Sequence, residues 1–170
     1  RAVAAMLVGS KAHPPGTLIV AMSKRGFGMR FDIAPHREPS TRAGRKYARV
    51  SEGDEIVGVV PIGRKDKILA MVTTGGRSLL CRVDEAALLA NPGRGVTMIK
   101  VEEGDGVLAI GVGREDDEPI LVVETEAGKN IEVGPGTDEV ARRGGKGRFV
   151  ARRTKIVRAA PPEPPTTLLN

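Results

Sequence analysis

The sequence predicts an all-β protein built from propeller-like repeats of four-stranded antiparallel blades, with about three full units in an open or partial ring. Two observations carry this prediction. Glycine occurs 22 times and proline 12 times in 170 residues, a mixture typical of short strands joined by frequent turns. Apolar strands and glycine turns also recur at intervals of 50 to 52 residues, a spacing typical of a four-stranded blade.

The first half of each unit is an apolar strand followed by a glycine turn. The strands cover residues 18–22, 68–73 and 120–125, and the turns contain Gly26, Gly76 and Gly128, which are 50 and 52 positions apart. Glycine adopts a positive φ at little steric cost, so we expect each of the three to close a hairpin at the same place.

The second half of each unit keeps the same register. Gly44, Gly95 and Gly147 are 51 and 52 positions apart, and each opens a strand with basic residues. The first two of these strands lead into a Gly-Asp turn at residues 53–54 and 104–105, whereas the third unit has Arg-Arg-Thr-Lys at residues 152–155 instead. The sequence therefore predicts units at residues 16–63, 66–113 and 118–159.

Both ends of the chain are expected to differ from the repeats. Residues 1–9 resemble the last strand of a unit, so we expect them to complete a blade of a single domain over residues 1–160. Residues 161–170 begin with four prolines in five positions. Because proline cannot donate a backbone hydrogen bond to a sheet, we expect a disordered tail there.

The charge indicates a polyanionic partner. The chain has 27 lysines and arginines against 21 acidic residues, a formal net charge of +6. Eight basic residues and no acidic one fall within residues 141–158. Solvated strand faces would account for isolated charges, but basic residues return beside the same glycine in every unit. Stacked units would place them along one rim that can follow a phosphate backbone.

Duplex DNA is the expected partner. Single-strand binders stack bases on aromatic side chains, and this chain has one tyrosine, three phenylalanines and no tryptophan. The sequence has no evident recognition helix and no zinc-ligand spacing, so we expect contacts to phosphates and to DNA shape instead of base edges.

Catalytic and compartment signals are sparse. Cys81 lies in an apolar strand, His13 and His36 lie in proline-containing loops, and Tyr47 occupies a packing position of the repeat. Lys146 is followed by Gly147, not by the serine or threonine of a Walker loop. We therefore expect no enzyme activity, metal or cofactor in this chain by itself. A single cysteine, no signal peptide and no long apolar run predict a cytoplasmic protein without membrane insertion.

The repeats resemble the blades of the carboxy-terminal β-pinwheel domains of the DNA gyrase and topoisomerase IV A subunits. The most specific match is Ala-Arg-Arg-Gly-Gly-Lys-Gly at residues 141–147, which is similar to the Gln-Arg-Arg-Gly-Gly-Lys-Gly box of gyrase A subunits. The match differs in two ways: the gyrase box belongs to the first blade but stands here in the last unit, and three full units replace the usual five or six. The sequence is compatible both with a broken pinwheel of the topoisomerase IV type and with a closed gyrase ring.

The resemblance implies a non-catalytic module of a bacterial type IIA topoisomerase that binds and bends duplex DNA. It would support ATP-dependent supercoiling, or relaxation and decatenation, in the bacterial nucleoid. Its partners would be DNA, the rest of the A subunit, and through it the B subunit; the ATP and Mg²⁺ of the parent enzyme belong to other parts of it. The alternative is a propeller-type protein-interaction module that docks an acidic partner.

The candidate DNA-binding residues are those of the box and the basic residues beside the repeated glycines. They are Arg142, Arg143, Gly144, Gly145, Lys146, Gly147, Arg148, Lys24, Arg25, Arg42, Arg45, Lys46, Arg49, Arg77, Arg94, Lys100 and Arg152.

Overall fold

The computed structural model describes residues 13–14, 16–38, 44–116 and 118–163. Within these ranges the only helices are two three-residue 3-10 turns, η1 (Ala34–His36) and η2 (Val83–Glu85), so the all-β prediction is confirmed. The strands of this part of the chain are β1 (Leu18–Ser23), β2 (Phe27–Asp32), β3 (Ile56–Pro61), β4 (Ile68–Thr73), β5 (Arg77–Arg82), β6 (Ala87–Leu88), β7 (Val96–Thr97), β8 (Val107–Gly113), β9 (Leu121–Thr125), β10 (Asn130–Val133), β11 (Arg148–Phe149) and β12 (Ile156–Ala160).

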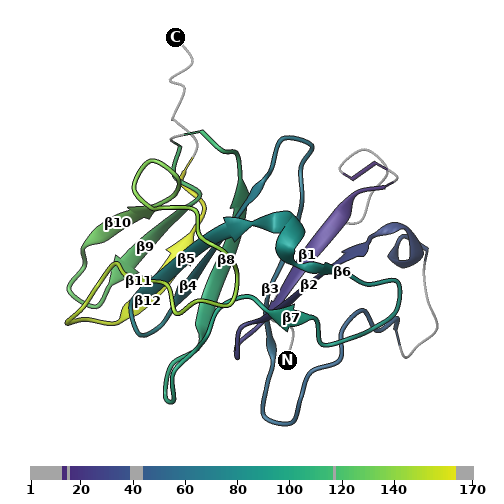
Figure 1. The fold of residues 1–170 in the computed structure, drawn as a ribbon, viewed down its shortest axis with the longest axis horizontal. Coiled ribbons are helices and arrows are strands. Elements are labelled where there is room, and N and C mark those ends of the chain that lie inside the picture. Colours follow the sequence, from purple (N-terminus) through teal and green to yellow (C-terminus); the bar gives the residue numbers. More distant parts are fainter. Residues whose placement is uncertain (1–12, 15, 39–43, 117, 164–170) are drawn as a thin grey trace.

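Three antiparallel hairpins form the centres of three sheets. They are β1–β2, β4–β5 and β9–β10, and a later strand of the same unit (β3, β8 or β12) pairs with the other edge of the first strand of each. The strands alternate side chains between the two sheet faces, so Leu69 and Ala70 of β4 enter different apolar clusters. The three sheets lie next to one another in sequence order (Figure 1).

The hairpin turns confirm the predicted equivalence of the repeated glycines. Gly26, Gly76 and Gly128 have φ values of 86°, 86° and 74°. Each donates its N–H to the carbonyl of the residue three positions earlier, at 3.0, 3.1 and 2.8 Å. A buried hydroxyl at that earlier position, from Ser23, Thr73 or Thr125, then accepts the N–H of the residue after the glycine. The three turns are therefore built in the same way.

In each of the last two units, the segment between the hairpin and the last strand pairs with the sheet of the unit before it. The sequence did not predict this pairing. Strands β6 and β7 of the second unit pair with β2 of the first, and β6 runs parallel to β2. Likewise β11 of the third unit pairs with β5 of the second. A blade is thus not one contiguous four-stranded antiparallel unit: neighbouring units are joined by an exchanged segment.

The exchange is possible because glycines let the backbones approach closely. A Cβ on Gly26 would overlap the carbonyl oxygen of Ile99, and one on Gly76 would overlap that of Ala151. In the same places the N–H of Met98 donates to the Gly26 carbonyl at 2.8 Å, and that of Val150 donates to the Gly76 carbonyl at 2.9 Å. A larger residue would push the exchanged segment away.

The core consists of layers between the sheets. One cluster joins the first two sheets and contains Met22, Met71 and Met98, while a second joins the other face of β4 and β5 to the third sheet. The middle sheet is therefore buried on both faces, which explains the continuous apolar runs of β4 and β5. A smaller cluster with Ile19 and Phe31 covers the outer face of the first sheet.

The third sheet has three strands, in the order β10–β9–β12, within the described residues. The predicted strand at residues 1–9 and most of the predicted tail, residues 164–170, lie outside those residues, as does Arg42. No helix in the described part of the chain is long and apolar enough to cross a membrane.

Candidate nucleic-acid interface

The basic segments of successive units run parallel and adjacent to one another. Ala48 forms a parallel bridge with Gly93, and one unit later Ile99 forms the equivalent bridge with Gly145. Next to each bridge, the N–H of Arg49 donates to Gly93 at 2.9 Å and that of Lys100 donates to Gly145 at 2.8 Å. The backbone thus places equivalent side chains at equivalent positions of one repeating surface.

One basic position recurs on this surface in all three units. Arg49, Lys100 and Arg152 each stand five residues after the repeated glycine, and all three side chains are exposed. None of them makes a side-chain hydrogen bond or ion pair within the described residues, and the guanidinium of Arg152 lies 5.9 Å from the ring centroid of Phe149. These three cations form what we call the rim.

The box at residues 141–147 is held by backbone hydrogen bonds on two sides, and is not a free glycine loop. The N–H of Ala141 donates to Leu80 of β5 at 2.8 Å, and that of Gly144 donates to Met98 of the second unit at 2.6 Å. Gly144 and Gly147 have φ values of 82° and 71°, and a Cβ on Gly147 would overlap the carbonyl oxygen of Ser78. The glycines therefore bring the box close to the middle sheet.

The side chains of the box differ in how they are engaged. The guanidinium of Arg143 donates to the carbonyl of Thr97 at 3.0 Å, and the Lys146 ammonium lies 3.2 Å from the Glu102 carboxylate. Arg142 is exposed and makes no side-chain contact of this kind with the described residues. Of the three cations, Arg142 is thus the most available to a ligand.

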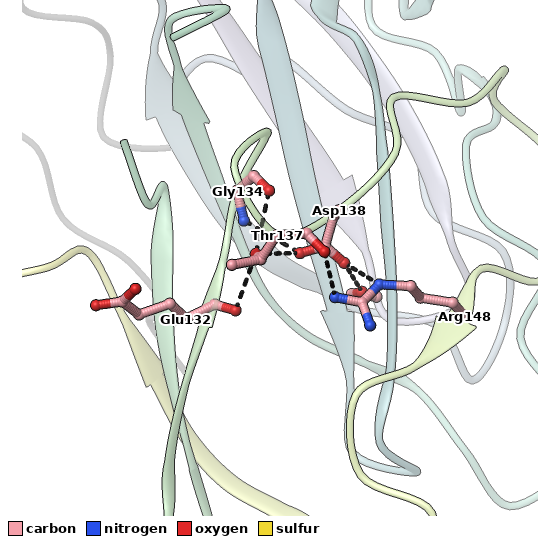
Figure 2. A network of polar contacts seen from close by, with 6 residues as sticks. Glu132, Gly134, Thr137, Asp138 and Arg148 are labelled. Atoms are coloured by element: carbon pink, nitrogen blue, oxygen red, sulfur yellow. Dashed lines mark hydrogen bonds and ion pairs between the residues drawn. The ribbon is translucent and has the colours of Figure 1, made fainter. Parts of the chain in front are cut away.

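Arg148 is exposed, but its guanidinium joins a polar network around a buried carboxylate (Figure 2). Its Nε donates to Asp138, whose side chain is 2% exposed and also accepts hydrogen bonds from Ser78, Thr137 and the N–H of Gly134. Burial opposes ionisation of Asp138, but these hydrogen bonds outweigh it and hold its pKa below the usual value. Arg148, a predicted DNA-binding residue, therefore also balances the charge of Asp138.

Three other candidate cations also have partners. Lys24 lies 3.6 Å from Glu55, and the guanidinium of Arg94 lies 4.4 Å from the ring centroid of Phe27. Arg77 is 3.9 Å from the ring centroid of Phe149 and donates to Gly147 at 3.3 Å. The remaining candidates, Arg25, Arg45 and Lys46, are exposed.

Two acidic residues of the interface were not identified from the sequence. Glu102 contacts both Arg77 and Lys146, and Asp138 holds Arg148. A third acidic residue, Asp105, was predicted from the sequence only as part of the Gly-Asp turn. In the structure it accepts hydrogen bonds from Thr73, Thr74, Gly75 and Gly106. Burial opposes its ionisation, but these bonds outweigh it and lower its pKa. Only the Gly-Asp repeat could have indicated this role.

Among the described residues, no group of three or more His, Cys, Asp or Glu side chains could hold a metal ion. Burial, with a smaller contribution from Glu85, raises the pKa of the Cys81 thiol to about 12, so the thiol is protonated at neutral pH and is not a nucleophile. Tyr47 stacks on Phe31 with 5.0 Å between the ring centroids, a packing role as expected.

No protein-family model matches the chain. Curated proteins do: the DNA gyrase A subunit of Aminobacterium colombiense is 33% identical over 128 residues, which are 74% of this chain and 15% of that protein. The DNA gyrase A subunit of Dehalogenimonas lykanthroporepellens is 26% identical over 133 residues, 78% of this chain and 16% of that protein. The chain thus spans about one-sixth of these relatives.

Solved structures agree on the fold. The C-terminal domain of DNA topoisomerase IV matches with a TM-score of 0.75 at 18% sequence identity, and the match covers 88% of this chain and 47% of that domain's chain. The DNA gyrase A C-terminal domain has a TM-score of 0.69 at 16% identity over 86% of this chain and 49% of its own. The E. coli ParC C-terminal domain has a TM-score of 0.70 at 20% identity over 87% of this chain and 61% of its own.

Stacked sheets that resemble these three domains make the protein a β-pinwheel domain. The chain belongs with the C-terminal β-pinwheel domains of type IIA topoisomerase A subunits, and its curated relatives are A subunits of DNA gyrase.

Proposed function

We propose that this domain binds duplex DNA along the rim and bends it, as a non-catalytic part of the A subunit of a bacterial type IIA topoisomerase in the cytoplasm. By binding DNA it would support ATP-dependent supercoiling, or relaxation and decatenation, carried out with the B subunit together with the rest of the A subunit. We propose no cofactor for this chain, since ATP and Mg²⁺ would act elsewhere in the parent enzyme.

The recurrence of one exposed cation on adjacent parallel segments is the observation that carries this proposal. Arg49, Lys100 and Arg152 share a register position, and the equivalent backbone bridges of Ala48 and Ile99 repeat from unit to unit. A regularly repeated cation suits a polymer with regularly spaced phosphates. Arg142 of the box adds a fourth exposed cation beside the same segments.

The aromatic side chains favour a duplex over a single strand. Phe31 and Tyr47 stack on each other, Phe27 lies under Arg94 and Phe149 lies beside Arg77. Each of the four aromatic rings contacts another side chain, and of the four only Phe149 is exposed, at 39%, whereas single-strand binding stacks successive bases on several open rings. Phosphate contacts are what this surface offers.

The salt dependence of DNA binding tests the proposal. The triple variant Arg49→Ala, Lys100→Ala, Arg152→Ala should bind a duplex more weakly than the wild type, because it loses phosphate contacts. Each lost contact should also flatten the slope of log K against log salt by about 0.9. The matched control is Arg64→Ala, Lys65→Ala, Lys67→Ala. It removes three exposed cations from the β3–β4 connection, which is at the ends of these strands away from the hairpin turns.

Equal losses in the two triple variants would indicate a diffuse field and contradict a rim. A wild-type chain that binds acidic proteins but shows no steep salt dependence with DNA would instead support a protein-interaction module. The box variant Arg142→Ala, Arg143→Ala, Lys146→Ala should also weaken binding. Because Arg143 and Lys146 contact the protein as well, its thermal unfolding must be compared with that of the wild type.

A further inference from the structure

Glu102 lies where the second and third units meet. Its carboxylate is 3.2 Å from the ammonium of Lys146 in the box and 3.4 Å from the guanidinium of Arg77 at the hairpin turn. The residue comes from the turn between β7 and β8, 44 positions before Lys146. One acidic side chain therefore contacts two of the predicted DNA-binding cations.

The two cations are held to different degrees. Arg77 has a side chain only 16% exposed, lies against Phe149 and donates to the Gly147 carbonyl, so it is fixed without Glu102. The Lys146 side chain is 63% exposed, and Glu102 is its one ion-pair partner within the described residues. Glu102 therefore acts mainly on the charge and position of Lys146.

The equivalent place between the first and second units has no such acid. The positions of Glu102, Lys146 and Arg77 correspond there to Ser51, Arg94 and Phe27, by the register of the repeated glycines. Arg94 lies over the Phe27 ring at 4.4 Å, and no carboxylate neutralises it within the described residues. The cation between the first and second units, Arg94, thus has no carboxylate partner among the described residues, whereas the equivalent cation between the second and third units, Lys146, is paired with Glu102.

We propose that Glu102 is an internal competitor for DNA phosphate, which holds Lys146 in an ion pair and sets the affinity of the box for a duplex. This proposal rests on the proposed DNA-binding function. A phosphate that approaches Lys146 must displace the Glu102 carboxylate or accept its repulsion. The box would bind at full strength only when this contact opens, whereas the rim and Arg94 bind without such a step.

The expected effect is moderate because the ion pair is exposed. Exposed pairs are weak and are screened by salt, so phosphate can displace Glu102. Release of the pair should strengthen binding by about two- to fivefold at low salt. One additional phosphate contact through Lys146 should steepen the salt slope by about 0.9.

The test compares Glu102→Gln with Glu103→Gln in duplex binding over a range of salt concentrations. Glu103 is the adjacent residue of the same turn; it is exposed and makes no side-chain hydrogen bond or ion pair with the described residues. Each variant removes one negative charge, but only Glu102→Gln releases Lys146. We expect tighter binding and a steeper slope for Glu102→Gln and a smaller change for Glu103→Gln.

A third variant assigns the effect to Lys146. With Lys146→Ala already present, Glu102→Gln should give no gain beyond that of Glu103→Gln. Equal gains from the two glutamine variants, or weaker binding by Glu102→Gln, would overturn the role of Glu102 while wild-type DNA binding stands. A wild-type chain that does not bind duplex DNA would contradict the proposed function itself.

Discussion

At the scale of single residues, the neighbours of a cation decide whether it is available to a ligand. Arg148 and Arg142 are both exposed and belong to the same basic stretch, yet Arg148 pairs with buried Asp138 while Arg142 has no side-chain hydrogen bond or ion pair with the described residues. The network around Asp138 is particular to one junction, because Ala86 and Val96 occupy the places of Asp138 and Arg148 one unit earlier. The acid and its base thus occur together at one junction and are both missing from the other.

Replacing Asp138 by Asn should destabilise the domain by about 1–3 kcal/mol at pH 7, since Arg148 and Ser78 would lose an ionised buried acceptor. The pKa of Asp138 is lowered in the folded state, so its ionisation contributes stability above the ordinary value of 3.8. That contribution is lost as the pH falls through the folded pKa. Denaturant unfolding at several pH values should therefore show a smaller acid loss in Asp138→Asn than in the wild type.

Asp84→Asn is the control for this measurement, because Asp84 is exposed and pairs only with exposed Arg82 among the described residues. Its change at pH 7 should stay within about 0.5 kcal/mol. An acid loss that is the same for Asp138→Asn and the wild type would show that Asp138 does not contribute to the pH dependence.

Residue types and spacing predicted the exposed rim cations and the packing roles of Cys81 and Tyr47, because burial and periodicity are visible in a sequence. The pairing of Glu102 with Lys146 was not predictable. The two residues are 44 positions apart and meet only because a segment of the third unit crosses to the second.

At the scale of elements, glycines form the hairpin turns and also allow the close backbone contacts between units. The hairpins were predictable because the turn and its two strands are adjacent in the sequence. The exchange of the third segment was not, since a segment that pairs with its own sheet and one that pairs with the preceding sheet give the same repeat length. The close approach of Gly76 to Ala151 appears only in three dimensions.

Gly76→Ala and Gly128→Ala should differ in their effect on stability. Both residues have a positive φ, so each alanine incurs about 1–2 kcal/mol of backbone strain. At Gly76 the new Cβ would also overlap the Ala151 carbonyl, whereas at Gly128 it meets no described atom within 4 Å. Overpacking typically adds about 1–3 kcal/mol, so Gly76→Ala should be the more destabilising by that amount. Equal unfolding free energies of the two variants would contradict the exchange.

At the scale of the whole molecule, the three sheets share cores and exchanged segments, so the basic segments have fixed positions relative to one another. Cores between the sheets bury both faces of the middle one. The repeat and the β-pinwheel resemblance were visible in the sequence because the period recurs three times. The parallel arrangement of the basic segments was not, since it follows from the bridges at Ala48 and Ile99.

DNA bending is the prediction that belongs to this scale. Rim cations repeated from unit to unit can all contact a duplex only if the duplex follows the surface on which they lie. Bending a site of about 20–30 base pairs by about 40–90° costs on the order of 1–6 kcal/mol, which several phosphate contacts would offset. We therefore expect duplexes long enough to span the rim to bind more tightly than short ones and to have a shorter end-to-end distance when bound.

Fluorescence transfer between dyes on the two ends of such a duplex measures this distance. Transfer should rise as wild-type protein saturates the DNA. With the Arg49→Ala, Lys100→Ala, Arg152→Ala variant it should rise less, even at concentrations that give full binding, because fewer contacts offset the bending energy. The control variant at Arg64, Lys65 and Lys67 should behave as the wild type does. If transfer is unchanged at saturating wild-type protein, the domain binds DNA without bending it, and the rim would then hold only a short, straight stretch of duplex.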